Sequence, residues 1–584
     1  MMRPETFDCP HGERCGGCFF LGVPYAQQLV EKQGLVRRAF DRYSEHAALA
    51  VDAVAGASPN TAYRVRAKLV CDQTGAVGLF ARDSHDVVDV PECRVLAPEL
   101  SRVAAAARKL LSNAAMSLDG LDLRLVDRGV LVTLIAPRGT PIADLSAFSA
   151  ALSEASSEVI GVAASFRDAR SAALLGTGHT VLFGNDVEAH HLSSTGPYHL
   201  AAHGAFTQVH LGQAERAHRA IEAELRARDA RRVLELYAGS AALSLRLAAA
   251  GFELSAVEAY EPALSQAKRA AREQNLHLTT ISARAEDATT QLAAQQARFD
   301  AVIVNPPRRG LSLEVRRALA RLAPRAIVYM SCNPATLARD LSHLKALGFA
   351  ANVISPFDMI PHSDAVECLV VLEYRGASEL CVVHQDELVI AVDRASYDEP
   401  EQLLARVREL PNGRMAEPVF PLDRDASGLT LFARPSAARS ELRAALVSGQ
   451  SFVALARGIT HKKGRIRRPL GPKRRGASAC TTYQRKSVHG GHSLLELDPG
   501  AASPEEIRRH LAAIGHPILG DARSCDAGSN SFFEHRHGLD RSFLHCSALR
   551  IALPTGTIEL SSALPGELAG VLASASPETA PLGE

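Results

Sequence analysis

The spacing of apolar positions changes along the chain, and each change marks a different kind of structure. From about residue 60 to 190, short alternations such as Ala67–Cys71 predict antiparallel strands, with one helix near residues 98–113. Between residues 213 and 374, apolar strands alternate with helical segments, which predicts βαβ units and a largely parallel sheet. After residue 376 the pattern is strand-rich again. The sequence therefore predicts a multidomain protein.

Length and composition agree with this division. A chain of 584 residues is longer than one hydrophobic core usually holds. The apolar fraction of 47% and the charged fraction of 22% are those of a globular protein rather than a disordered or fibrous one. Apolar runs stay below the roughly 18 residues that a membrane-spanning helix needs, and the N-terminus lacks the pattern of a secretory signal. We expect a cytoplasmic monomer without a membrane partner.

Charge is balanced overall but uneven along the chain. Lys and Arg number 65 against 64 Asp and Glu, so RNA binding would depend on local basic segments. Lys462 to Arg475 holds eight Lys and Arg residues and no acid, and its Gly and Pro content predicts a loop. Arg308 to Arg325 holds six arginines against one acid, Glu314. A charge run is usually a solvated face, but both strips are candidate phosphate contacts.

A ligand site is predicted at the carboxyl edge of the parallel sheet. The strand Val233–Leu236 runs into a small-residue turn at Tyr237–Ala241, and the next strand ends at Glu258. Small residues let the backbone approach a ligand, and an acid at the second strand's end can accept both ribose hydroxyls of an adenosine. The GxGxxG string of dinucleotide sites is missing, which favours a ligand with adenosine and no pyrophosphate. A tight turn that binds nothing is the alternative.

Two later strings follow neighbouring strands of the same sheet. They are Asn305-Pro-Pro-Arg-Arg-Gly310 and Ser331-Cys-Asn-Pro334. Together with Pro361–Glu367 they resemble the S-adenosylmethionine-dependent RNA uracil-5-methyltransferases, and within that family the bacterial 23S rRNA branch. The resemblance runs from about Cys9 to Tyr374. It implies a Rossmann-like, class I α/β methyltransferase fold, S-adenosylmethionine as cofactor, and RNA as substrate, with 23S rRNA favoured.

The chemistry of that reaction gives two residues a role. Uracil C5 is a poor nucleophile until a thiolate adds at C6, and Cys332 stands at the family's thiol. The C5 proton must leave before the enzyme is released, and Glu367 stands at the family's base. A buried structural thiol and a surface acid are the alternatives. A small-molecule or protein methyltransferase is the rival function, but neither substrate class needs a thiolate to activate carbon.

The resemblance also implies which residues contact the cofactor. They are Gln208, Tyr237, Gly239, Glu258 and Asn305. The chain departs from the family at Ala241, where a second glycine is common, and at His210, where an asparagine is common. We expect the added methyl group at Ala241 to loosen cofactor binding without changing the reaction.

Cysteines cluster near the N-terminus. Three of the eleven have the spacing C-x5-C-x2-C, and a fourth follows a turn farther along the chain. In a chain of this size the pattern fits metal binding better than a disulfide framework. Spacing alone leaves zinc and a [4Fe-4S] cluster open, and the methyltransferase resemblance favours iron–sulfur. The predicted ligands are Cys9, Cys15, Cys18 and Cys93. Methyl transfer needs no redox step, so we expect a structural or RNA-orienting role.

The second half of the chain carries a separate resemblance. Phe420–Leu429 and Gly515–Asp521 resemble the motifs of the RluA-like RNA pseudouridine synthases, over a segment from about Leu380 to Leu564. The resemblance implies an α+β fold and places Asp423 at the family's catalytic aspartate. Asp425 would take that place only in a shifted register.

This second resemblance has gaps. Phe420 and Pro421 replace a His-Arg pair, Phe452 replaces a tyrosine, and a Thr-Gly-Arg string near the last helix is lost, although Arg508 remains. A carboxylate without its electrostatic partners would bind RNA without isomerising uridine. A pseudouridine synthase and a degenerate RNA-binding module therefore both stay open.

The predicted organisation has five segments. They are residues 1–50, an iron–sulfur segment; 51–200, a β-rich, RNA-facing domain that supplies Cys93; 201–375, the methyltransferase domain; 380–570, the pseudouridine synthase-like domain; and 574–584, a flexible tail.

Overall fold

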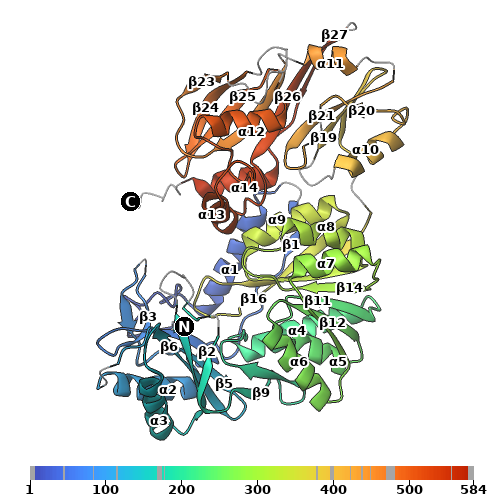
Figure 1. Cartoon of the computed structure of the whole chain (residues 1–584). Helices are drawn as coiled ribbons and strands as arrows, with labels where there is room; N and C mark the ends of the chain where they lie inside the picture. The colour runs from blue at the N-terminus through green and yellow to red at the C-terminus, as the bar shows by residue number, and fades with distance from the viewer. Residues whose placement is uncertain are drawn as a thin grey trace, which may run out of the picture.

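The computed structural model describes most of the chain. The described residues are 7–576 without 44–45, 83, 114–115, 168–173, 177, 377–378, 395–399, 421–422, 436–438, 447–448, 468–479, 501 and 554–555. Figure 1 shows three units in a row, which we call the β-rich unit (residues 63–202), the α/β unit (residues 211–375 with the first helix and strand) and the C-terminal unit (residues 380–576). The predicted tail lies outside the described residues from residue 577 on.

The β-rich unit is a seven-stranded sheet in the order β4-β3-β2-β5-β6-β7-β8. Its strands are β2 (Arg66–Cys71), β3 (Val77–Phe80), β4 (Val87–Asp89), β5 (Gly120–Val126), β6 (Gly129–Pro137), β7 (Val159–Arg167) and β8 (Thr180–Gly184). The expected helix is α2 (Pro98–Leu111), but a second helix, α3 (Ile142–Ala155), also packs on the sheet. Because α3 forms a crossover, β6 and β7 are parallel, and the prediction of antiparallel strands alone was wrong here.

A short hairpin connects the β-rich unit to the α/β unit. It consists of β9 (Val187–His191) and β10 (Tyr198–Ala202), which pair antiparallel. β9 contacts β5, while β10 contacts helices of the α/β unit. The segment after β10 therefore reaches the carboxyl edge of the next sheet.

The α/β unit is built on an eight-stranded sheet in the order β1-β16-β17-β15-β14-β11-β12-β13. Its strands are β1 (Ala50–Val51), β11 (Arg232–Leu236), β12 (Glu253–Glu258), β13 (Leu278–Ser282), β14 (Ala301–Val304), β15 (Ala326–Ser331), β16 (Phe349–Phe357) and β17 (Glu367–Tyr374). Strands β11 to β15 are mutually parallel, which confirms the predicted βαβ units. β17 runs antiparallel to β15, so it begins at the carboxyl edge, where its first residue, Glu367, lies beyond the end of β15.

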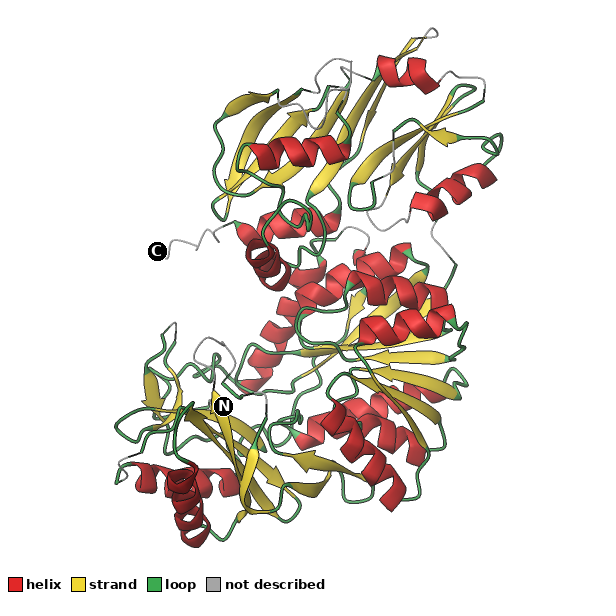
Figure 2. Ribbon diagram, viewed as in Figure 1, coloured by secondary structure: helices red, strands yellow, loops and turns green. Residues whose placement is uncertain are grey.

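Helices cover both faces of this sheet (Figure 2). One face carries α4 (Leu211–Arg226), α5 (Ala242–Ala249) and α6 (Glu261–Glu273), and the other carries α1 (Tyr25–Phe40), α7 (Ala285–Ala294), α8 (Leu313–Leu322) and α9 (Pro334–Ala346). The first 50 residues thus do not stand apart, because α1 and β1 complete the α/β unit. A fully buried ion pair between Lys32 of α1 and Asp358, 2.5 Å apart, fixes this arrangement.

The C-terminal unit is a ten-stranded mixed sheet with helices, as its predicted α+β class requires. Its strands are β18 (Val382–Gln385), β19 (Val389–Arg394), β20 (Glu417–Pro418), β21 (Ser427–Ala433), β22 (Gln450–Ala456), β23 (Lys463–Ile466), β24 (Thr481–His489), β25 (His492–Asp498), β26 (Leu544–Leu553) and β27 (Gly556–Ser561). Its helices are α10 (Pro400–Glu409), α11 (Arg439–Ala445), α12 (Pro504–Ala513), α13 (Ala527–His537) and α14 (Gly566–Ala575).

The structure differs from the prediction in each of the two basic strips. The first part of the Lys462–Arg475 strip is an edge strand, β23, rather than the predicted loop, and residues 468–479 lie outside the described part. In the second strip Arg316 is fully buried and ion-paired, so its prediction as a phosphate contact was wrong. No helix within the described residues is long and apolar enough to cross a bilayer.

Candidate active site

Two loops meet at the carboxyl edge of the α/β sheet. β14 ends at Val304 and leads into the loop of residues 305–311, which we call the arginine loop. β15 ends at Ser331, directly before Cys332. The first turn of α9 joins the two loops, since Asn333 Nδ2 and Thr336 Oγ1 each donate to the carbonyl oxygen of Arg308 at 3.0 Å. Adjacent parallel strands therefore place Arg308 and Cys332 at one point, as the sequence predicted for this edge.

Glycine is required at position 310 of the arginine loop. Gly310 has φ +77°, and a Cβ there would lie 2.5 Å from Oδ2 of the buried Asp340. The loop can thus turn tightly against α9 only without a side chain at this residue.

Cys332 and Glu367 lie next to each other. β15 and β17 are antiparallel, and Ser331 lies opposite Cys368. Cys332, the residue after Ser331, therefore faces Glu367, the residue before Cys368. Burial raises the pKa of Glu367 to about 7, and Arg308 opposes the shift. Burial and the neighbouring Glu367 raise the pKa of the Cys332 thiol, and Arg308 again opposes the shift. Sequence reasoning paired the thiol with the carboxylate but missed Arg308 as their shared cation.

This trio has the properties of a nucleophile and a general base. A carboxyl group with a pKa near 7 can exchange a proton at neutral pH. A guanidinium beside the thiol favours the thiolate, which is the reactive form of cysteine. The site therefore has a nucleophile, a base and a cation that holds both charges in a partly dry environment.

The predicted cofactor residues line two adjoining hollows at the same edge. One hollow includes Glu258, and the other includes Gln208, Tyr237 and Asn305. Both are lined by Gly239. All five predicted residues therefore lie along one continuous groove that leads toward the arginine loop.

The groove fits an adenosine-bearing ligand at its open end. Glu258 accepts hydrogen bonds from the backbone N–H of Gly239 at 3.0 Å and of Tyr260 at 2.9 Å, which fixes its carboxylate at the strand end. Ala241, which has φ +55°, caps α5 in the left-handed conformation, where a glycine would be less strained. His210 caps α4 instead and stacks on Tyr63, so this departure from the family lies outside the groove wall.

Sequence reasoning missed a buried polar wall at the inner end of the groove. Glu235 lies in the middle of β11, accepts a hydrogen bond from Ser244, and burial raises its pKa to about 7. His218 is half-buried in the same lining, and burial lowers its pKa to about 4. Both side chains are thus held in or near their neutral forms. The only signal in the sequence was one acid inside the apolar strand Val233–Leu236.

The four predicted metal ligands gather where the N-terminal segment meets the β-rich unit. The backbone of Cys15 pairs with that of Ala81 in an isolated β-bridge, and Cys93 packs against the same small hydrophobic cluster as Cys15. Burial, together with the neighbouring thiols of Cys93, Cys15 and Cys9, raises the pKa of Cys18 to about 12. All eleven cysteines are free thiols. Within the described residues, however, no three Cys, His, Asp or Glu side chains have the arrangement of metal ligands.

The C-terminal unit has a hollow that contains the predicted catalytic aspartate. Asp423 and Phe452 line it together with Arg394. Arg508 holds both carboxylate oxygens of Asp423, one of them at 2.8 Å, and Arg523 lies 3.8 Å away. Burial opposes ionisation of Asp423, but Arg508 holds its pKa below the usual value.

Arg508, the arginine that the sequence retains, reaches Asp423 from α12, so the carboxylate keeps a cationic partner although Phe420 replaces a motif residue. Asp425 lies outside this pairing and contacts Arg523 at 3.3 Å instead. Pro421, one of the replaced motif residues, lies outside the described residues.

Comparison with known proteins gives the family of the α/β unit. The family model described as tRNA (Uracil-5-)-methyltransferase matches residues 197–375. An uncharacterized RNA methyltransferase of Gloeobacter violaceus is 30% identical over 380 residues, which cover 62% of this chain and 82% of that protein.

Two solved structures are also similar to parts of the chain. Pyrococcus abyssi tRNA (uracil-54, C5)-methyltransferase in complex with S-adenosyl-L-homocysteine is 22% identical, with a TM-score of 0.49 over 61% of this chain and 86% of that one. Human RNA Pseudouridylate Synthase Domain Containing 1 is 20% identical, with a TM-score of 0.27 over 32% of this chain and 86% of that one.

The matched residues contain both strand-end loops, the thiol, its neighbouring carboxylate and the five predicted cofactor residues of the groove. The family match and this site thus concern the same part of the molecule. The chain belongs to the S-adenosylmethionine-dependent RNA uracil-5-methyltransferase family.

Proposed function

We propose that this protein methylates C5 of a uridine in RNA, with 23S rRNA as the favoured substrate, through a covalent bond between Cys332 and C6 of the base. The observation that carries the proposal is the cross-strand adjacency of Cys332 and Glu367 at the end of the cofactor groove, where the charge of Arg308 acts on both groups. The preference for 23S rRNA rests on the sequence resemblance alone, as does the proposal that the protein acts as a monomer.

The reaction assigns one task to each residue. Gln208, Tyr237, Gly239, Glu258 and Asn305 would hold S-adenosylmethionine, which would supply the methyl group. Cys332 adds to C6 as the thiolate, and the enolate that forms makes C5 nucleophilic. After C5 has gained the methyl group, Glu367 accepts the C5 proton. The electron pair of that C–H bond restores the C5–C6 double bond and expels Cys332.

The charges of the site fit this order. Arg308 stabilises the thiolate during attack and faces the carboxylate that must be ionised to accept the proton. Because the pKa of Glu367 is about 7, a large fraction of the group is a base at neutral pH. The family's need for an extruded base fits a site at a sheet edge, where a uridine turned out of its stack can enter.

We expect Cys332→Ala to abolish 5-methyluridine formation, with kcat reduced by more than about 10⁴-fold, the scale seen when a covalent nucleophile is removed. Nucleoside mass spectrometry of treated RNA measures the product, and calorimetry measures cofactor affinity, which should not change. Cys480→Ala, at a partly buried thiol of the C-terminal unit, is the matched control. Methylation that survives in Cys332→Ala would refute the covalent mechanism.

We propose that Cys9, Cys15, Cys18 and Cys93 hold a [4Fe-4S] cluster, with zinc as the alternative. Support comes from the C-x5-C-x2-C spacing and from the mutual influence of the thiols on their pKa values. No step of methyl transfer passes through this group. Its position between the N-terminal segment and the β-rich unit suits a structural or RNA-orienting role.

Purification without oxygen should yield about four iron and four sulfide per chain, as the cluster formula requires. Elemental analysis and acid-labile sulfide measure both. Cys18→Ser should lose the iron and lower the melting temperature, whereas Cys480→Ser should keep it. One zinc ion per chain without acid-labile sulfide would show that the four cysteines hold zinc instead of the cluster.

A second function is supported by one observation in the C-terminal unit. Asp423 keeps a buried, two-point contact with Arg508 in a hollow that also contains Phe452. We propose that this unit isomerises a uridine to pseudouridine, with Asp423 as the attacking carboxylate. A degenerate module that only binds RNA is the alternative.

We expect Asp423→Asn to abolish pseudouridine in RNA treated with the full chain, because an amide cannot attack the sugar or base. Asp425→Asn, two residues along and outside the Arg508 pair, should keep the product. Mass spectrometry of nucleosides separates pseudouridine from 5-methyluridine, whereas tritium release would not. Wild-type protein that binds RNA but forms no pseudouridine would establish the module instead.

A further inference from the structure

A buried group of charged side chains lies beneath the arginine loop. Arg316 of α8 and Asp340 of α9 are fully buried, and Arg339 is 4% exposed. Asp340 Oδ1 accepts from Arg339 Nε at 2.9 Å and lies 3.3 Å from Arg316 Nη1. Asp340 Oδ2 accepts from the hydroxyl of Tyr329 at 2.7 Å. One carboxylate is therefore shared by two buried guanidinium groups.

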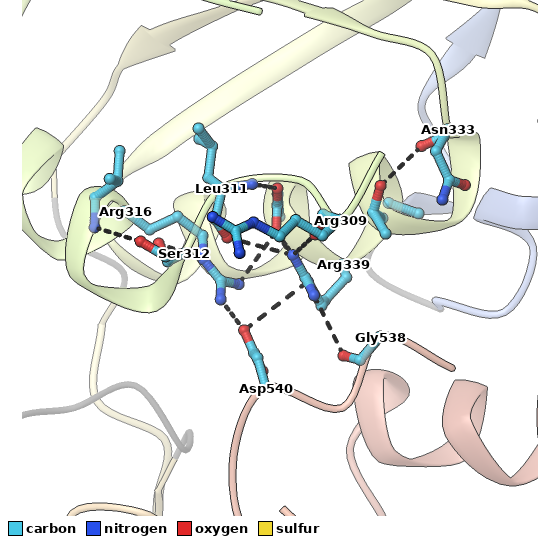
Figure 3. Close-up of polar contacts among 12 residues, drawn as sticks. Arg309, Leu311, Ser312, Arg316, Asn333, Arg339, Gly538 and Asp540 are labelled. Atoms are coloured by element: carbon cyan, nitrogen blue, oxygen red, sulfur yellow. Dashed lines mark hydrogen bonds and ion pairs between the residues drawn. The ribbon is translucent and has the colours of Figure 1, made fainter. Parts of the chain in front are cut away.

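The C-terminal unit supplies a second carboxylate to the same group. Asp540 follows α13, which ends at His537 and is capped by Gly538. It forms an ion pair with Arg316 and lies 3.9 Å from Arg339 Nε. Burial opposes its ionisation, yet Arg316 and Arg339 hold the pKa of Asp540 below its usual value. Arg339 Nη1 also donates to the carbonyl oxygen of Gly538 at 3.4 Å. Figure 3 shows Asp540 directed at both arginines from the neighbouring unit.

Arg339 also binds the backbone of the arginine loop. Arg339 Nη2 donates to the carbonyl oxygens of Arg309 at 2.9 Å and Leu311 at 3.3 Å. Asp340 Oδ2 accepts from the backbone N–H of Leu311 at 2.7 Å. Arg339 thus contacts the loop with one nitrogen and the C-terminal unit with another (Figure 3). The loop is the segment that places Arg308 beside Cys332 and Glu367.

Helix α9 connects these contacts mechanically. It is buried along most of its length, since α1, α8 and, from the C-terminal unit, α14 contact it. Its first turn follows Cys332 and holds the carbonyl oxygen of Arg308, and its second turn carries Arg339 and Asp340. A change in the charge balance around Arg339 therefore acts on both loops of the methyl-transfer site.

We infer that Asp540 is a positioning residue for methyl transfer: its carboxylate, which the C-terminal unit places between Arg316 and Arg339, balances the buried charges that hold the arginine loop in the conformation that the Cys332 site needs. This role rests on the proposed function of the α/β unit and is independent of catalysis by Asp423. The two units are then joined because one completes the charge balance beneath the other's active site. A guanidinium left without its buried carboxylate would move toward water and release the loop.

The test is Asp540→Asn in the full chain, which keeps the shape of the side chain and removes its charge. We expect kcat for methylation to fall by about 10- to 100-fold, the cost of a small misplacement of reacting groups, with KM for S-adenosylmethionine unchanged. Hydrogen exchange at residues 308–311 should become faster. The matched control is Glu559→Gln. It also removes a carboxylate of the C-terminal unit, but Glu559 and its ion-pair partner Arg550 are both exposed.

A second variant separates positioning from loss of folding. In Arg316→Met/Asp540→Asn the cation and the carboxylate are removed together, and the contacts of Arg339 and Asp340 with the loop remain. We expect kcat and slow exchange at residues 308–311 to recover relative to Asp540→Asn. Failure to recover, or wild-type kcat and exchange in Asp540→Asn, would overturn the inference. Hydrogen exchange needs no substrate, so it tests the effect of Asp540 on the arginine loop even if the protein does not methylate uridine.

Discussion

The rest of the site depends on the hydrogen bonds that the start of helix α9 donates to the carbonyl oxygen of Arg308. Cys332 and Arg308 belong to loops after different strands, and Glu367 begins a third strand that arrives from the opposite direction. Parallel pairing brings the loops to one edge but does not set their distance. The two hydrogen bonds from Asn333 and Thr336 do so, at the cost of allowing only glycine at position 310.

This contact links the local chemistry to the larger architecture. The same helix is also in contact with α1 from the N-terminal segment and with α14 from the C-terminal unit. The charges beneath the loop come from both the α/β unit and the C-terminal unit. A site of this kind is sensitive to residues far from it in the sequence, because they complete the shell around one helix.

Much of the α/β unit could be predicted from the sequence, since its strands are continuous apolar runs separated by amphipathic helices. The strand-end position of Cys332, the Glu258 end of the groove and the start of α9 at Pro334 follow from that pattern. Long-range partners did not follow. Arg508 beside Asp423, Asp540 beside Arg316 and the joining of β1 to the α/β sheet each unite segments with no local signal for the pairing. Helix α3 was missed for another reason, because its apolar spacing lay inside a region read as strands.

Trapping of the RNA adduct in Glu367→Gln tests the central claim most directly. If Cys332 bonds to C6 and Glu367 accepts the C5 proton, this variant should methylate bound RNA once and then remain attached to it, because elimination is blocked. Denaturing electrophoresis and mass spectrometry should find the chain joined to methylated RNA through Cys332, and Cys332→Ala/Glu367→Gln should form no adduct. Free 5-methyluridine product at the wild-type rate from Glu367→Gln, or an adduct at a different residue, would contradict the account.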